Sequence, residues 1–159
     1  MQGMIRDLGL SLGFDVWIAS NDRNGEYRGE ALSSGSLATW PLVATDTVTL
    51  IDVVWFEKGK SAVAAAFEVE HSTSIYSGLI RMLDLILGSS AISQAPIFIV
   101  APNARRDEVF SQWRRPAFAQ HSTVEVRYLP YQHLHDHQEA IKRFGSGLKP
   151  IQNLSERPI

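Results

Sequence analysis

The stretch that most constrains the fold is residues 50–70. Two runs rich in β-branched, aromatic and small apolar residues, 50–56 and 62–70, flank a turn that contains Gly59, and this pattern predicts a β-hairpin. Both runs are apolar enough to be covered on both faces, yet they carry carboxylates where apolar residues are expected. Buried carboxylates are costly unless they are paired or bind a metal. The acids that need such a partner are Asp52, Glu68 and Glu70.

The register of the hairpin decides whether these acids meet. Side chains alternate along a strand, so Glu68 and Glu70 project from the same face, about 7 Å apart. A three-residue loop at 59–61 sets Asp52 opposite Glu68, whereas a two-residue loop turns the acids to opposite faces unless a β-bulge restores the alignment. A three-acid site therefore requires an odd-numbered loop or a bulge.

Three convergent carboxylates would also require a cation. On strands about 4.8 Å apart they cannot all ionise without compensation. Mg²⁺ takes oxygen ligands, commonly one or two carboxylates with several waters, and Mn²⁺ is its expected substitute. Such ions polarise a scissile phosphate and deliver hydroxide near neutral pH, which is the chemistry of phosphodiester cleavage. The alternative is that Glu68 and Glu70 lie on a solvated face and Asp52 at an edge.

The rest of the chain predicts one α/β domain over residues 1–159. The run 96–102, bounded by prolines, is typical of a central parallel strand, and Pro116 ends or kinks a helix. Residues 20–48 are expected to form a long loop and residues 150–159 a flexible tail. Helices that return between strands favour a mixed central sheet flanked by helices. Helices are predicted at 4–12, 75–87, 103–119 and 133–144, and further strands at 14–19 and 124–129.

Composition limits the compartment and the partners. Lys and Arg number 15 against 17 Asp and Glu, a net charge of −2, so the total charge does not indicate nucleic-acid binding, although a local basic patch is what matters. The absence of cysteine excludes disulfides and cysteine metal sites. The chain shows no signal-peptide pattern and no apolar run long enough to span a membrane. We expect a cytoplasmic protein without a membrane partner.

The acids and their surroundings resemble a known family. Asp52, followed after fifteen residues by Glu68-Val69-Glu70 and then a helix, is similar to the motif of the PD-(D/E)xK nuclease superfamily, whose restriction-endonuclease-like fold has an αβββαβ core. The predicted order of elements matches that core from about residue 4 to residue 144. The resemblance implies a Mg²⁺-dependent DNA endonuclease of restriction or defence type. It assigns the metal to Asp52, Glu68 and the backbone carbonyl of Val69.

One position departs from the family pattern. Glu70 stands where the family usually has lysine, and a glutamate can act as general base or extra ligand but cannot supply positive charge. A minority of restriction endonucleases have E-x-E here. The resemblance therefore leaves a second interpretation, an inactive module of the same fold that serves DNA binding or protein assembly. It also implies a homodimer as one arrangement, and such modules are sometimes domains of larger proteins. A small-ligand or protein-interaction domain is a third class.

Other candidate residues carry weaker signals. The superfamily often uses an additional acid, and the sequence does not choose among Asp7, Glu26 and Glu30. Alternating histidines at 133, 135 and 137 point about 200° apart on a helix, which makes a poor metal chelate. Phosphate contacts or local ion pairs, such as Arg105 with Asp107 or Glu108, are alternative roles for the basic residues. Those residues are Lys58, Lys60, Arg105, Arg106, Arg114 and Arg115.

Overall fold

The computed structural model of the chain describes residues 1–42, 46–72, 74–88, 94–121 and 123–158. Its centre is a five-stranded sheet with the strand order β1-β4-β5-β6-β7. Strands β1, β4 and β5 are antiparallel neighbours, whereas β5, β6 and β7 run parallel, so the sheet is mixed as predicted. The bounds are β1 (Phe14–Ile18), β4 (Val53–Glu57), β5 (Val63–Val69), β6 (Ile97–Ala101) and β7 (Val126–Pro130).

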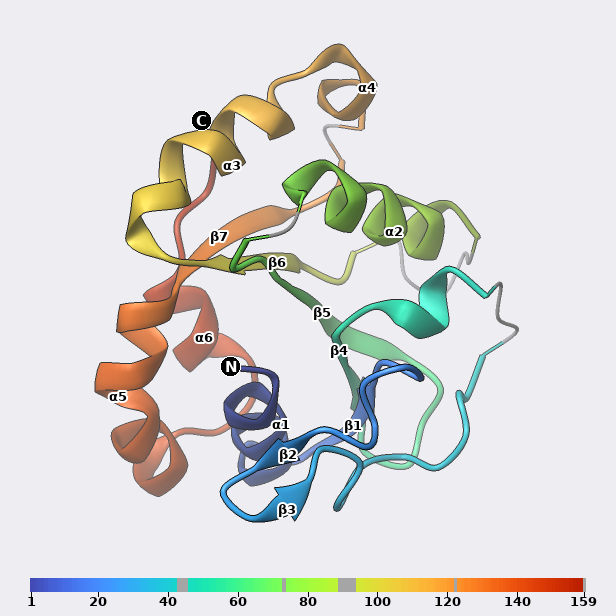
Figure 1. Cartoon of the computed structure of the whole chain (residues 1–159), viewed down its shortest axis with the longest axis vertical. Helices are drawn as coiled ribbons and strands as arrows, with labels where there is room; N and C mark the ends of the chain where they lie inside the picture. Colours follow the sequence, from blue (N-terminus) through green and yellow to red (C-terminus); the bar gives the residue numbers. More distant parts are fainter. Residues whose placement is uncertain (43–45, 73, 89–93, 122, 159) are drawn as a thin grey trace.

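Helices cover both faces of this sheet and give the molecule three layers (Figure 1). One face carries α2 (Ile75–Gly88), α3 (Arg106–Trp113) and α4 (Pro116–Ala119). The other carries α1 (Gln2–Ser11), α5 (Tyr131–Phe144) and α6 (Lys149–Leu154). The 3₁₀ helices η1 (Val48–Leu50) and η3 (Asn103–Arg105) precede β4 and α3. No helix in the described ranges is long and apolar enough to cross a bilayer.

The two helical layers explain why the hairpin strands are apolar on both sides. Val54 and Ala66 belong to the apolar cluster beneath α2, and Val53 and Phe67 belong to the cluster beneath α1 and α5. Because side chains alternate along a strand, the even-numbered positions at this end of β4 and β5 face α2. The residues that continue this series are Asp52, Glu68 and Glu70.

A β-bulge fixes the register of the hairpin. Trp55 pairs with Ala65, whereas Phe56 pairs with Val63, so Ala64 is left as the extra residue on β5. An inserted residue reverses the alternation of side chains on one side of the bulge. The pairing of β4 with β5 therefore follows one register next to the turn and a different register at the end that carries the acids.

The turn has an even number of residues. The loop consists of the four residues 58–61, so it is neither of the two loop lengths that the sequence analysis compared. An even-numbered loop alone would separate the acids, and the bulge restores their alignment. Continued one residue beyond β4, the observed register places Asp52 opposite Glu68. The requirement for an odd-numbered loop or a bulge is therefore met by the bulge.

The parallel half of the sheet defines a second edge. β6 is buried along its whole length and pairs with β5 and β7, which confirms the central parallel strand predicted at 96–102. The carboxyl ends of parallel strands meet at one edge of a sheet, where α/β proteins commonly bind their ligands. Here that edge brings together Glu70 after β5 and Tyr131 after β7.

The segment 20–48 is more regular than predicted. It contains a small second sheet formed by β2 (Glu26–Tyr27) and β3 (Glu30–Ala31). Arg6 of α1 holds this hairpin, because its buried guanidinium donates hydrogen bonds to the carbonyls of Ala31 and Leu32, at 2.7 and 3.2 Å. Residues 43–45 lie outside the described residues.

Two predictions for the C-terminal half are wrong. The single helix predicted at 103–119 is divided into η3, α3 and α4, and Pro116 lies in the first turn of α4, where its missing N–H is tolerated. The flexible tail predicted at 150–159 instead forms α6, which buries Ile151, and a β-bridge between Glu156 and Tyr128. Ile159 lies outside the described residues.

Candidate functional site

The three hairpin acids gather beneath the first half of α2, at the edge where the parallel strands end. A cavity of about 370 Å³ at this place is lined by Asp52, Val69, Glu70, Ser74, Ser77 and Arg81. Glu68 lies next to it on the same strand as Val69 and is completely buried. The cavity therefore combines carboxylates from the sheet with side chains from the helix that covers them.

Asp52 is held by hydrogen bonds from two different elements. Its Oδ2 accepts from the backbone N–H of Val69 at 2.7 Å, and its Oδ1 accepts from the side-chain amide of Gln2 at 3.0 Å. Burial raises the pKa of Asp52, and these two hydrogen bonds act in the opposite direction. The Gln2 amide also donates to Asp22, at 2.8 Å, so two carboxylates share one side-chain nitrogen.

Glu68 forms a bidentate ion pair with an arginine that the sequence interpretation did not single out. Arg81 of α2 donates from Nε to one carboxylate oxygen at 2.8 Å and from Nη2 to the other at 2.6 Å. Burial raises the pKa of Glu68 to about 8, and the charges of Asp52 and Glu70 add to this shift, while Arg81 opposes it. Two parallel N–H donors are the strong arrangement for a carboxylate, so Arg81 is the principal partner of Glu68.

Glu70 is buried against α2 at a point where the helix has no side chain. A Cβ added to Gly78 would collide with Glu70 Oε1 and would approach Glu68 Cβ to 3.3 Å. The glycine thus allows the helix to lie directly on the acids. The main chain of Glu70 continues the sheet, because its N–H donates to the Val100 carbonyl at 2.8 Å.

Two further side chains border the acids from the neighbouring strand ends. Burial raises the pKa of the Tyr131 phenol to about 12, and the charges of Glu70 and Asp52 contribute to the shift. The Tyr131 ring stacks on His71 with 6.0 Å between centroids. Arg105 donates from Nη1 to the Glu70 carbonyl at 3.3 Å and forms an ion pair with Glu108 at 2.9 Å.

The additional acid near the site is Asp22, which the sequence interpretation did not consider. Of the three acids it left open, Asp7 forms an ion pair with Arg6 at 2.8 Å, and Glu30 lies 3.8 Å from the same guanidinium. Glu26 is exposed on β2. Asp22 lies in the loop after β1, and its contact with Asp52 passes through Gln2.

The donor set of the cavity is compatible with a hard divalent cation. Its oxygen donors are the carboxylates of Asp52 and Glu70 and the hydroxyls of Ser74 and Ser77, and Mg²⁺ commonly takes one or two carboxylates. Within the described ranges, however, no three Asp, Glu or His side chains lie close enough together to hold a metal ion. The ion pair with Arg81 turns Glu68 toward α2. Asp52 and Glu70 thus line the cavity, whereas the carboxylate of Glu68 is paired with Arg81.

Local interactions occupy several of the basic candidates. Arg106 pairs with Glu156 at 2.7 Å, Lys58 with Asp15 at 2.9 Å and Lys60 with Glu57 at 2.9 Å. Arg115 donates to Gln112 and lies over the ring of Tyr76, which projects from the first turn of α2. Arg105 has the pairing with Glu108 that the sequence argument gave as an alternative to phosphate binding.

The three alternating histidines lie on α5, and each ring has its own local contact. His133 Nδ1 contacts the carbonyl of Leu154 at 2.8 Å, and His137 Nδ1 contacts the carbonyl of His133 at 2.9 Å. His135 lies beside Asp136 on the exposed side of the helix. These contacts tie two of the rings to main-chain groups.

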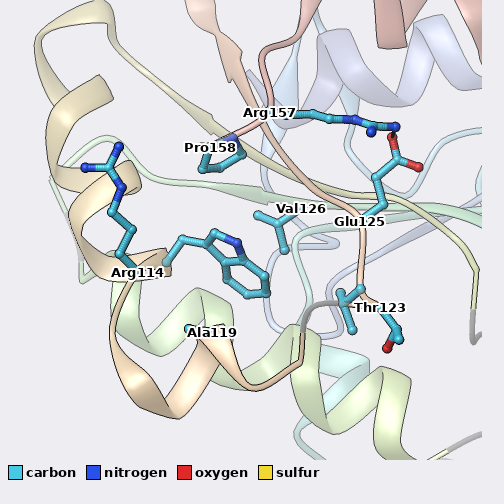
Figure 2. A pocket seen from close by; sticks show the side chains of 9 residues that line it. Arg114, Ala119, Thr123, Glu125, Val126, Arg157 and Pro158 are labelled. Carbon is cyan, nitrogen blue, oxygen red and sulfur yellow. Dashed lines mark hydrogen bonds and ion pairs between the residues drawn. The ribbon is translucent and has the colours of Figure 1, made fainter.

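A larger hollow lies at the opposite edge of the sheet. It measures about 490 Å³ and is lined by side chains that include Arg114, Ala119, Val126 and Pro158 (Figure 2). Arg157 and Glu125 form an ion pair of 3.2 Å at its rim. Val126 begins β7, whereas Tyr131, which borders the acids, follows the end of that strand. This hollow is therefore separate from the acidic cavity, and Glu125 is the one acidic residue in its described lining.

The fold and the site define a mixed α/β domain with a buried acidic cluster at the carboxyl ends of its parallel strands. The chain belongs to the family described as the C-terminal domain of the type II restriction enzyme NmeDI, whose model matches residues 1–146. A relative, the type II restriction enzyme NmeDI of Neisseria meningitidis serogroup C, is 33% identical over 134 residues. The match covers 78% of this chain and 37% of the relative, so the chain spans little more than a third of that enzyme's length. No solved structure matches the chain.

Proposed function

We propose that the chain is a Mg²⁺-dependent DNA endonuclease domain of restriction type. The observation that carries this proposal is the gathering of three acids beneath α2, where Asp52 and Glu70 line one cavity and Glu68 lies buried beside it. The chain's membership of a restriction-enzyme family supports it. The order α1, β1, β4, β5, α2, β6 agrees with the αβββαβ core of the PD-(D/E)xK superfamily, and we assign the fold to that superfamily.

The metal is assigned to the hairpin acids. Asp52 and Glu68 would hold it, with the Val69 carbonyl, and Glu70 would act as an additional ligand or as general base. A divalent cation bound there would polarise the scissile phosphate and acidify a bound water. The protein contributes the fixed orientation of Asp52, through Val69 and Gln2, and the close packing of α2 on Glu68 and Glu70.

The reaction is hydrolysis of a phosphodiester. A water oxygen forms a bond to phosphorus while the bond from phosphorus to the leaving oxygen breaks. One proton of the water passes to Glu70, whose carboxylate lines the cavity, and the leaving oxygen takes a proton from solvent. Manganese would substitute for magnesium at the same oxygen ligands.

A second candidate is an inactive module of the same fold that binds DNA or assembles with other chains. The observation that favours it is the pairing of Glu68 with Arg81, together with Glu70 in the usual place of a lysine. The relative is much longer than this chain, so the recognition of DNA and a homodimeric arrangement are proposals for a larger protein.

Cleavage of supercoiled plasmid tests the two candidates. Wild type, Asp52→Asn and the control Asp15→Asn are incubated with Mg²⁺ or Mn²⁺. Asp15 lies on β1 and pairs with Lys58 at the turn, away from the cavity. We expect nicking by wild type and by the control, and a loss of at least about a hundredfold in Asp52→Asn, because a metal ligand becomes neutral.

Either of two results would contradict the nuclease proposal. One is that wild type does not cut with either metal. The other is that Asp52→Asn cuts as fast as wild type. A metal-independent shift of the plasmid in a gel without cutting would support the DNA-binding module instead.

A further inference from the structure

We propose that Arg81 is a further catalytic residue of this site. In the metal-free protein its guanidinium binds both oxygens of Glu68, and with a divalent cation held by Glu68 the same guanidinium would be released to bind the scissile phosphate. The inference rests on the proposed nuclease function. It adds the source of positive charge that Glu70 cannot provide.

The position of Arg81 in α2 is the first argument. Ser77 and Gly78 follow Ser74 by three and four residues and precede Arg81 by four and three, so these residues lie on one side of α2. Gly78 brings that side into contact with Glu68 and Glu70. Arg81 therefore reaches the acids from above the sheet, and its side chain lines the cavity together with the two serines.

The second argument is the charge of the cavity. Asp52, Glu68 and Glu70 lie within electrostatic range of one another, since Asp52 and Glu70 both act on Glu68. Among the six residues that line the cavity in the described part of the chain, Arg81 is the one with a cationic side chain. A phosphodiester that approached the acids alone would be repelled. The guanidinium of Arg81 in the cavity would reduce that repulsion.

The third argument is the exposure of the two partners. Glu68 has no exposed surface, whereas the side chain of Arg81 is 27% exposed. The guanidinium therefore has one side on a buried carboxylate and another side toward the cavity. Because the arginine stem is long and flexible, the charged group can leave Glu68 for a ligand in the cavity without movement of the helix.

The chemistry of phosphoryl transfer gives the guanidinium its role. In the transition state negative charge is spread over the non-bridging oxygens, and positive groups placed at them are worth several orders of magnitude in rate. A guanidinium fork can bind two such oxygens at once, as it binds the two oxygens of Glu68 here. The two donors that Glu68 now occupies are therefore the ones that would bind the phosphate oxygens during catalysis.

The test compares Arg81→Met and Arg81→Lys with wild type in two measurements. Plasmid cleavage with Mg²⁺ should fall at least about a hundredfold in Arg81→Met and about tenfold in Arg81→Lys, which keeps the charge but loses the fork. Mn²⁺ binding without DNA, followed by electron paramagnetic resonance, should tighten about tenfold in Arg81→Met, because a competing cation has been removed. A merely structural arginine would not produce this opposite pair of effects.

A matched control is Arg127→Met. Arg127 is a half-buried arginine that pairs with Glu125 at 2.7 Å and lies outside the acidic cavity. We expect it to lower the melting temperature while both the rate of cleavage and the affinity for Mn²⁺ stay at wild-type values. If Arg81→Met does not fold, Arg81→Lys decides. A tenfold slower rate at an unchanged melting temperature supports the inference, and a wild-type rate overturns it.

The failures of the two proposals can be told apart. If wild type cuts and Arg81→Met cuts equally well, the role of Arg81 is wrong and the nuclease proposal stands. If Arg81→Met loses Mn²⁺ binding together with cleavage, the arginine only holds Glu68 in place, and the inference is also overturned. If wild type shows no metal-dependent cleavage, the proposed function is wrong, and the inference is wrong as well because it rests on that function.

Discussion

Glu68 is a fully buried carboxylate with a guanidinium on one side and two carboxylates nearby. Its ordinary pKa of 4.5 rises to about 8 in the folded chain because of burial, and the charges of Asp52 and Glu70 add to the effect. The folded state therefore holds the proton more tightly than the unfolded state. The resulting contribution to stability is complete below about pH 4.5 and is lost as the pH rises through about 8.

Glu68→Gln should remove this pH dependence. Between pH 5 and 8.5, without metal, the free energy of unfolding of wild type should fall relative to that of Glu68→Gln by on the order of 2–4 kcal/mol. Urea titrations at several pH values measure both proteins, and Glu139→Gln, on the exposed side of α5, is the control. If the free energies of unfolding of wild type and Glu68→Gln depend on pH in the same way, folding does not raise the pKa of Glu68.

At the residue scale the sequence located the acids but not their partners. Asp52, Glu68 and Glu70 were visible because each interrupts an apolar run. Arg81 has a local signal, because it is the one cation in the largely apolar helix α2. Asp22 and Gln2 gave none, because their contact with Asp52 joins residues 30 to 50 positions apart in the chain. Such contacts exist only after the sheet and α1 have assembled.

At the scale of elements, α2 depends on a glycine at the acids. Alanine is favoured over glycine in a helix by about 1 kcal/mol, so a glycine inside an apolar helix requires a reason. Gly78 has one, because any Cβ there would meet Glu70 and Glu68. A Cβ added to Gly88, at the end of the same helix, would meet no atom within 4 Å among the residues that the structure describes. The two glycines form a natural pair of test sites.

Gly78→Ala should destabilise the protein and Gly88→Ala should not. At position 78 the cost of overpacking, about 1–3 kcal/mol, exceeds the gain in helix propensity. At position 88 only the gain remains, and it is reduced at a helix end. Thermal unfolding of both variants measures the difference. A more stable Gly78→Ala would mean that α2 does not lie as close to the acids as the structure places it.

The sequence predicted elements well where periodicity was strong. The parallel strand at 96–102 and the helix at 75–87 agree with β6 and α2 to within two residues. It predicted poorly where one residue decides the geometry. Ala64 as an extra residue in β5 has no local signal. The helix does break next to Pro116, as expected, but the proline begins the short helix α4 that follows the break. Short strands such as β3 depend on Arg6, a contact between distant parts of the chain.

At the scale of the whole molecule, charge says little about a DNA partner. The net charge of −2 is small, and ion pairs within the fold already use several of the basic candidates. Binding to a phosphate backbone depends on cations placed along its path. Arg81 in the cavity and Arg115 over Tyr76 both lie at α2. An approach of DNA along this helix is therefore part of the proposed function.

The C-terminal segment completes the sheet and the layer beneath it. β7 ends the strand order of the five-stranded sheet, and its edge is covered where Tyr128 and Glu156 exchange hydrogen bonds of 2.7 and 2.8 Å. An uncovered edge strand invites association with other chains. Ile151 of α6 is completely buried in the cluster beneath α1 and α5. The segment was expected to be flexible because nothing in its local sequence reveals these two contacts.

Removal of residues 149–159 should therefore destabilise the whole molecule. Burial of Ile151 is worth about 2 kcal/mol, and the two main-chain hydrogen bonds add about 1 kcal/mol each. A loss of about 4 kcal/mol lowers the melting temperature by about 10 °C in a domain of this size, and light scattering should detect association through the uncovered edge of β7. Removal of residues 157–159 alone keeps Glu156 and should leave both measurements unchanged. Equal melting temperatures for the two truncated proteins would show that α6 and the bridge add nothing to the fold.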